Sequence, residues 1–169
     1  MSNELAREIE SNVTIRFQDC DPFGHLNNAK YIDYFINARE DQLLQHYDLD
    51  IYKMGKESRC NWLITKHQIS FCAPVAYREE VRIRTSLIQF TENSLLMEGT
   101  MLRKDGRNLK SFIWTEFRYV SLATGKSTPH PRELMDFLER VLLKEEGLDA
   151  RDYEARARAL LSRINLAAA

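Results

Sequence analysis

Several motifs that mark common hydrolases and nucleotide-binding enzymes are absent from this sequence. It contains no Gly-x-Ser-x-Gly nucleophile elbow, no Gly-x-x-x-x-Gly-Lys-Ser/Thr phosphate loop and no Gly-x-Gly-x-x-Gly fingerprint. It has no His-Glu-x-x-His zinc motif either, and its four histidines lack the spacing of metal ligands. Any hydrolytic chemistry must therefore rest on another arrangement, and we expect no metal.

Cysteine is scarce, and long apolar runs are missing. The three cysteines, Cys20, Cys60 and Cys72, are odd in number and form no Cys-x-x-Cys pair, which argues against a disulfide framework and a zinc ribbon. Reduced thiols are typical of a cytoplasmic protein. No apolar run approaches membrane-spanning length, and the N-terminal residues are too charged for a signal peptide. We expect a cytoplasmic protein that does not enter a membrane.

An excess of charge of either sign is also lacking. The 169 residues include 24 basic and 25 acidic side chains, for a net charge of −1. This balance gives no reason to expect nucleic acid or an anionic membrane as a partner. The length suits one domain that buries a core without disulfides.

Hydrophobic periodicity predicts one strand, a long helix, four further strands and then more helices. An Asp-Gly pair, Asp105 and Gly106, separates two alternating runs and predicts a hairpin. The expected strands cover residues 13–17, 61–71, 81–87, 95–102 and 109–120; the expected helices cover 28–43, 129–143 and 149–166, and 48–57 is mixed.

This order of elements predicts an α+β fold, in which one antiparallel sheet curls around a mainly apolar central helix. A single curled sheet leaves its far edge and part of the helix without cover. We therefore expect a partner subunit.

The loop before the central helix carries groups that suit catalysis. Asp21 lies in a Pro-Phe-Gly turn just ahead of the helix start. A helix start offers unpaired backbone N–H groups and a partial positive charge, which can polarise a carbonyl and hold an oxyanion. A nearby carboxylate can attack that carbonyl or activate a water. Thioesters suit so sparse a site because thiolate is a good leaving group.

The run from Asp19 to Tyr31, Asp-Cys-Asp-Pro-Phe-Gly-His-Leu-Asn-Asn-Ala-Lys-Tyr, resembles a family signature. It is similar to the D-x-D-x-x-G-H-[VL]-N-N-x-x-Y motif of hotdog-fold acyl-CoA thioesterases of the 4-hydroxybenzoyl-CoA thioesterase type. The resemblance implies a hotdog domain over residues 1–130, followed by a C-terminal helical extension over 131–169 that packs on the domain or on a partner subunit.

The same resemblance implies roles for individual residues. Asp21 would be the base or nucleophile, and the backbone N–H near Asn28 would be the oxyanion donor. His25 and Asn27 would shape the site or orient water. The acyl pocket would include Tyr31, Phe35 and Phe71. The family also implies a homodimer or homotetramer with active sites at the subunit interface, and CoA as part of the substrate rather than a cofactor.

Two departures from the family pattern keep alternatives open. Many relatives carry Glu where this chain has Ile36, although the matching Arg39 is present. The turn at 90–94 also lacks the basic residues with which some relatives contact CoA phosphates, and only the turn with Lys104, Arg107 and Lys110 offers substitutes. A thioesterase for acyl carrier protein and a non-catalytic acyl-binding protein are therefore rival hypotheses.

Simpler roles compete with the catalytic ones. Asp is a favoured turn residue, Asn27 and Asn28 are typical helix caps, and Asp19 is expected to be structural. Cys20 has no evident base beside it and is expected to be a small buried residue. The C-terminal helices are expected either to cover the sheet or to form a lid over the acyl channel.

Overall fold

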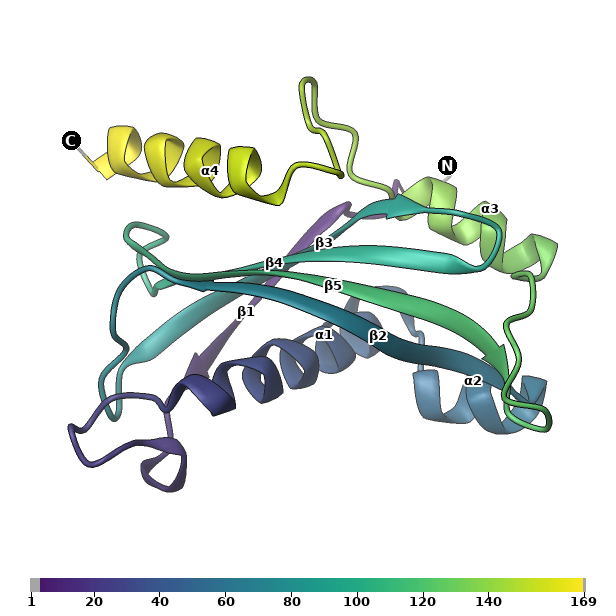
Figure 1. The fold of residues 1–169 in the computed structure, drawn as a ribbon, viewed down its shortest axis with the longest axis horizontal. Coiled ribbons are helices and arrows are strands. Elements are labelled where there is room, and N and C mark those ends of the chain that lie inside the picture. Colours follow the sequence, from purple (N-terminus) through teal and green to yellow (C-terminus); the bar gives the residue numbers. More distant parts are fainter. Residues whose placement is uncertain (1–3, 169) are drawn as a thin grey trace.

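A five-stranded antiparallel sheet forms the centre of the computed structural model, which describes residues 4–168 and their side chains as far as residue 164 (Figure 1). The strand order is β1-β3-β4-β5-β2, so β1 and β2 are the edges. The strands are β1 (Glu8–Thr14), β2 (Cys60–Phe71), β3 (Glu80–Phe90), β4 (Ser94–Arg103) and β5 (Leu109–Ser121).

Helices lie on both faces of this sheet (Figure 1). The long helix α1 (Tyr31–Tyr47) runs along one face, with the short α2 (Ile51–Ser58) beyond its C-terminal end. Helix α4 (Tyr153–Ala168) lies over the opposite face, and α3 (Arg132–Val141) sits at one end. No helix within residues 4–168 is long and apolar enough to cross a membrane.

The face of α1 that meets the sheet supplies one hydrophobic core. Phe35 is fully buried there and packs so closely on Gly99 of β4 that a Cβ at Gly99 would lie 2.9 Å from the Phe35 ring. A glycine at this point lets the helix approach the strand. The same cluster includes Tyr31, Tyr34, Ala38 and Ile113.

The opposite face of the sheet forms a second core with α4. Phe112 and Trp114 of β5 pack against Tyr153, whose hydroxyl donates to the Phe112 carbonyl at 3.0 Å. The α4 helix therefore covers the sheet of its own chain on the side away from α1 (Figure 1).

A bulge in edge strand β2 determines which of its side chains face α1. The register against β5 shifts between Ile64 and Lys66, so Thr65 is an extra residue. If the strand alternated regularly with no bulge at Thr65, Trp62 and Ile64 would point away from the face that Ile69 and Phe71 occupy. The bulge brings apolar residues from both halves of β2 to the α1 side.

The predicted α+β class, the curled antiparallel sheet around a long helix and the C-terminal helices are confirmed. The first strand was predicted wrongly at residues 13–17. It covers Glu8–Thr14, where charged residues such as Glu10 pair across the exposed face with Arg84 and obscure the pattern. Phe17 instead lies in a 3-10 turn and is 77% exposed.

Helix α2 was missed in the segment described as mixed. The sequence feature that marks the start of this helix is its N-cap, Asp50, whose carboxylate accepts the Lys53 N–H at 2.8 Å. Asp48, the C-cap of α1, ends that helix in the left-handed conformation, with φ 54°. So short a helix has too few turns to show a clear helical period.

Candidate active site

The Asp21 carboxylate organises the loop that precedes α1. Its Oδ1 accepts the backbone N–H of Phe23 at 2.9 Å and that of His25 at 3.2 Å. Gly24, with φ 78°, allows the turn to close, and its N–H donates to the Asp21 carbonyl at 3.0 Å. Because both amides use Oδ1, Oδ2 has no hydrogen bond from any described residue and remains available for chemistry.

This loop is held against the segment that leads into β3. The N–H of Leu26 donates to the Val75 carbonyl at 2.8 Å, and the N–H of Tyr77 donates to the Gly24 carbonyl at 2.9 Å. An ion pair supports that segment, since Lys110 Nζ lies 2.8 Å from Glu79 and 2.9 Å from the Pro74 carbonyl. Lys110 is therefore a buried structural cation on β5 and does not belong to an exposed basic turn.

Asp19 fixes the other side of the loop. Its Oδ2 accepts the Tyr34 hydroxyl at 2.8 Å, and that hydroxyl accepts the Arg16 N–H at 3.0 Å. The Asp19 carbonyl also accepts the Asn27 N–H at 2.9 Å. Asp19 thus ties the loop to α1, and the sequence alone gave no signal that Tyr34 would be its partner.

The start of the helix leaves one backbone donor without a partner. A 3-10 turn (Asn28–Lys30) leads into α1, and the Asn27 side chain caps it by accepting the Ala29 N–H at 2.9 Å. The Lys30 N–H donates to the Asn27 carbonyl at 2.8 Å. No acceptor among the described residues takes the Asn28 N–H, as expected for the first residue of a helical turn.

Five of the seven predicted site residues line one small pocket of about 280 Å³. Tyr31 and Phe71 form an aromatic wall, with ring centroids 5.0 Å apart in an edge-to-face arrangement. Asn27 lies beside the pocket as the cap, whereas Phe35 is in the core and does not line it. The lining residues are Asp21, His25, Leu26, Asn28, Tyr31, Phe71, Cys72, Ala73 and Pro74.

Cys20 is not an activated thiol. Burial, with the carboxylates of Asp19 and Asp21, raises the pKa of Cys20. Its Sγ donates to the Arg16 carbonyl at 3.4 Å, which requires the protonated form. Within residues 4–168 no group of three or more His, Cys, Asp or Glu side chains could hold a metal ion.

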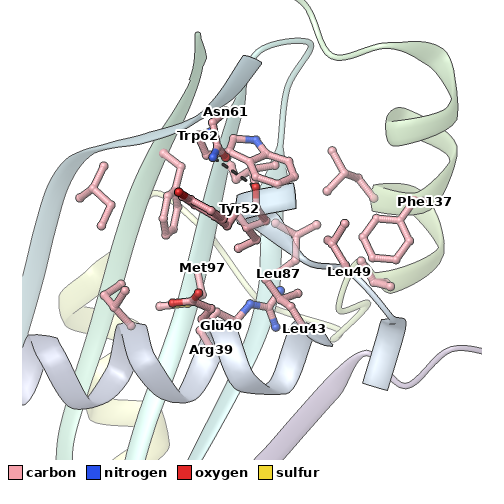
Figure 2. A pocket seen from close by; sticks show the side chains of 17 residues that line it. Arg39, Glu40, Leu43, Leu49, Tyr52, Asn61, Trp62, Leu87, Met97 and Phe137 are labelled. Atoms are coloured by element: carbon pink, nitrogen blue, oxygen red, sulfur yellow. Dashed lines mark hydrogen bonds between the residues drawn. The ribbon is translucent and has the colours of Figure 1, made fainter. Parts of the chain in front are cut away.

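A second pocket, also of about 280 Å³, lies at the other end of α1 (Figure 2). Helices α1, α2 and α3 and the sheet form its walls, and most of its lining is apolar. The family position Ile36 faces this pocket, as do Arg39 and Trp62, and none of these three lines the Asp21 pocket. Sequence reasoning did not find this second site, because residues from three helices and four strands build it.

One comparison with known proteins identifies a family. A family model described as the thioesterase-like superfamily matches residues 15–138. No curated protein sequence matches significantly.

Solved structures share the fold at low identity. A hypothetical protein of Thermus thermophilus, TT1821, is 20% identical over 81% of this chain and 99% of its own, with a TM-score of 0.72. Slr0204, a 1,4-dihydroxy-2-naphthoyl-CoA thioesterase from Synechocystis, is 14% identical over 78% and 95%, with a TM-score of 0.70. The hypothetical protein SAV2348 of Staphylococcus aureus, solved in complex with CoA, is 11% identical over 91% and 98%, with a TM-score of 0.74. Because the family model covers well over half of the chain, and the fold is that of these structures, the chain belongs to the thioesterase-like superfamily and has its hotdog fold.

Proposed function

We propose that the protein hydrolyses an acyl thioester of CoA to a free acid and a thiol. The observation that carries this proposal is one pocket that holds both the Asp21 carboxylate and the unpartnered N–H of Asn28. Family membership supports the reaction class. CoA as the carrier is supported by the likeness to a CoA complex from S. aureus and to a CoA thioesterase from Synechocystis.

In this reaction the thioester carbonyl oxygen points at the Asn28 N–H, which stabilises the oxyanion as it forms. The free Oδ2 of Asp21 takes a proton from a water that attacks the carbonyl carbon, or it attacks that carbon itself to form a mixed anhydride that water hydrolyses after the thiolate has left. The C–S bond then breaks and the thiolate leaves. His25 shapes the rim and Asn27 holds the helix start, and no metal or redox cofactor enters the steps.

Thiol release from a panel of CoA esters tests the proposal. The panel spans acetyl, medium-chain, long-chain and aromatic acyl groups, and we expect turnover of at least one class. Hydrolysis only of acyl groups held on acyl carrier protein would move the proposal to that carrier. Saturable binding of acyl-CoA without thiol release would identify a non-catalytic acyl-binding protein instead.

Asn28→Pro tests the oxyanion donor, because proline lacks the backbone N–H. Proline is tolerated at the first position of a helical turn, and Asn27 already has the extended backbone (φ −62°, ψ 133°) that precedes proline. We expect kcat to fall about 100-fold, the usual effect of losing one oxyanion donor. Asn28→Ala, which keeps the N–H, is the control, and equal rates for the two variants would contradict this role.

We also propose that the protein works as a homodimer in which β2 strands from two copies pair. Strand β2 is a sheet edge of 12 residues, and it exposes Leu63, Ile64 and Phe71. Unpaired edges with exposed apolar side chains favour pairing with another chain. The bulge at Thr65 confines the pairing to the segments on its two sides.

Such pairing would bring the two kinds of pocket together. Within one chain, Ile64 at the second pocket lies about 23 Å along β2 from Phe71 at the Asp21 pocket. In an antiparallel pair of β2 strands, the start of one lies beside the end of the other. The second pocket of one copy would then adjoin Asp21 of its partner, which gives each active site an acyl pocket in trans.

Sedimentation velocity at several concentrations checks this assembly. We expect a species of twice the 19.8 kDa chain, and Leu63→Asp should shift it toward monomer by placing charges in the paired edges. Leu122→Asp is the matched control, because both leucines are 58% exposed and Leu122 lies outside β2. A wild-type monomer at every concentration, or equal effects of the two variants, would contradict the β2 dimer.

A further inference from the structure

The second pocket has a distinct floor and mouth. Leu87, Met97, Leu138 and Val141 are almost completely buried and form its floor. Tyr52 on α2, which is 68% exposed, and the exposed Glu40 lie at the mouth. A volume of about 280 Å³ is at the small end of the range for ligand pockets and suits a modest acyl group.

The cationic side chain of Arg39 lies among the apolar side chains that line this pocket. Figure 2 shows the guanidinium of Arg39 beside the apolar side chains of Leu43 and Leu87. Its Nη1 donates to the hydroxyl of Thr85 at 3.1 Å, and Thr85 in turn donates to the Gln42 amide oxygen. These bonds hold the guanidinium near the floor of the pocket.

No carboxylate among the described side chains lies within ion-pair distance of Arg39. The neighbouring Glu40 is exposed and forms no ion pair with Arg39, and Thr85 is neutral. Burial lowers the pKa of Arg39 to about 10, opposed by the Tyr47 hydroxyl, so the side chain stays charged at neutral pH. A desolvated guanidinium with only neutral partners is costly, and a carboxylate that pairs with it in two parallel bonds offsets that cost.

We infer that this pocket binds an acyl group that is apolar along its length and carries a carboxylate at the end remote from the thioester. The carboxylate pairs with Arg39 at the floor, and the apolar stretch lies against Leu87, Met97 and Leu138. The substrate class is therefore the CoA monothioester of a dicarboxylic acid. This inference rests on the proposed thioesterase activity and on the proposed β2 dimer, which places this pocket beside Asp21 of the partner copy, and it names the substrate of that site.

Kinetics with a matched pair of substrates tests the inference. Octanoyl-CoA and the CoA monothioester of octanedioic acid differ only in the terminal carboxylate. We expect the wild type to favour the octanedioyl ester at least tenfold in kcat/KM, which is about 1.4 kcal/mol. Arg39→Met, which keeps the length of the side chain, should abolish or reverse this preference. A tenfold discrimination is the size expected for a charge-assisted hydrogen bond.

Two controls keep the outcome decisive. Thr85→Val removes the hydrogen bond that holds Arg39 but keeps the guanidinium, so the preference should weaken without being reversed. Calorimetric titration of the wild type with octanedioate and octanoate measures the pocket without hydrolysis, and only octanedioate should bind with saturation.

The inference and the proposed function fail in different ways. An equal or better rate with octanoyl-CoA, or with 4-hydroxybenzoyl-CoA, would overturn the dicarboxylate assignment and leave the thioesterase intact. An unchanged preference in Arg39→Met would overturn the role of Arg39. Octanedioate binding without hydrolysis of any ester would support the pocket and overturn the proposed function.

Discussion

Asp21→Asn should lower kcat for thioester hydrolysis between about 100-fold and 10,000-fold, the range that general acid–base catalysis contributes. Asparagine keeps the shape of the side chain, and its amide oxygen still accepts the N–H groups of Phe23 and His25. The variant loses the charge and basicity of the carboxylate. The loss therefore tests chemistry rather than the fold of the loop. Thiol release with the best ester of the panel measures it.

Asp33→Asn is the matched control, because it removes the same charge from an exposed residue of the first turn of α1. Asp33 makes only a surface pair with Lys30 at 3.2 Å, which is worth little. We expect activity within about twofold of wild type. Full activity of Asp21→Asn, or an equal loss in both variants, would remove Asp21 from the mechanism.

The parts of this site that are close in sequence could be predicted, because local turn chemistry determines them. Asp21, His25 and Asn28 fall within one loop and helix start, so their meeting in one pocket needs no long-range information. Tyr31 follows one helical turn later. Phe71 comes from the end of β2, and only the family resemblance placed it there.

The parts that depend on distant segments could not be predicted. Arg39 was named as a motif residue, but its role depends on Thr85, 46 residues away, and on the lack of a carboxylate within ion-pair distance among the described side chains. Glu98 and Arg156 are separated by 58 residues. Periodicity gives the faces of a helix or strand and says nothing about which charges meet after packing.

The pair of Glu98 and Arg156 attaches α4 to the sheet. Both side chains are 7% exposed, and two hydrogen bonds join them at 2.9 and 2.7 Å. The Trp114 indole N–H also donates to Glu98 at 3.0 Å, while Glu145 accepts from the other side of the guanidinium at 2.7 Å. Burial alone would lower the pKa of Arg156, but the hydrogen bonds to Glu98 and Glu145 raise it, so Arg156 is charged at any working pH.

Arg156→Met should lower the free energy of unfolding by about 3–5 kcal/mol, because it leaves Glu98 buried without its cation. Chemical denaturation followed by circular dichroism measures this change. Arg163→Met, which removes an exposed arginine from the same helix, should cost less than about 0.5 kcal/mol. A loss in Arg156→Met no larger than that of Arg163→Met would show that the buried pair does not hold α4.

The double variant Glu98→Gln with Arg156→Met separates the cost of the orphaned charge from the loss of contacts. Glutamine is neutral and still accepts the Trp114 N–H, so we expect it to recover at least half of the lost stability. Acid should weaken the same attachment. Arg156 lowers the pKa of Glu145, so this contribution is present at neutral pH and is lost as pH falls through that lowered value.

Trp114 fluorescence distinguishes release of α4 from unfolding of the sheet. Trp114 packs against Tyr153 of α4, whereas Trp62, the other tryptophan, packs against Tyr119 and His130 away from α4. If Arg156→Met shifts the emission at denaturant concentrations where circular dichroism is unchanged, α4 leaves as a separate unit and the hotdog sheet stands without it. If the two signals change together, α4 is part of one cooperative fold. The hotdog domain would then end near residue 130 in the sequence, but the sheet and α4 would unfold together as one unit.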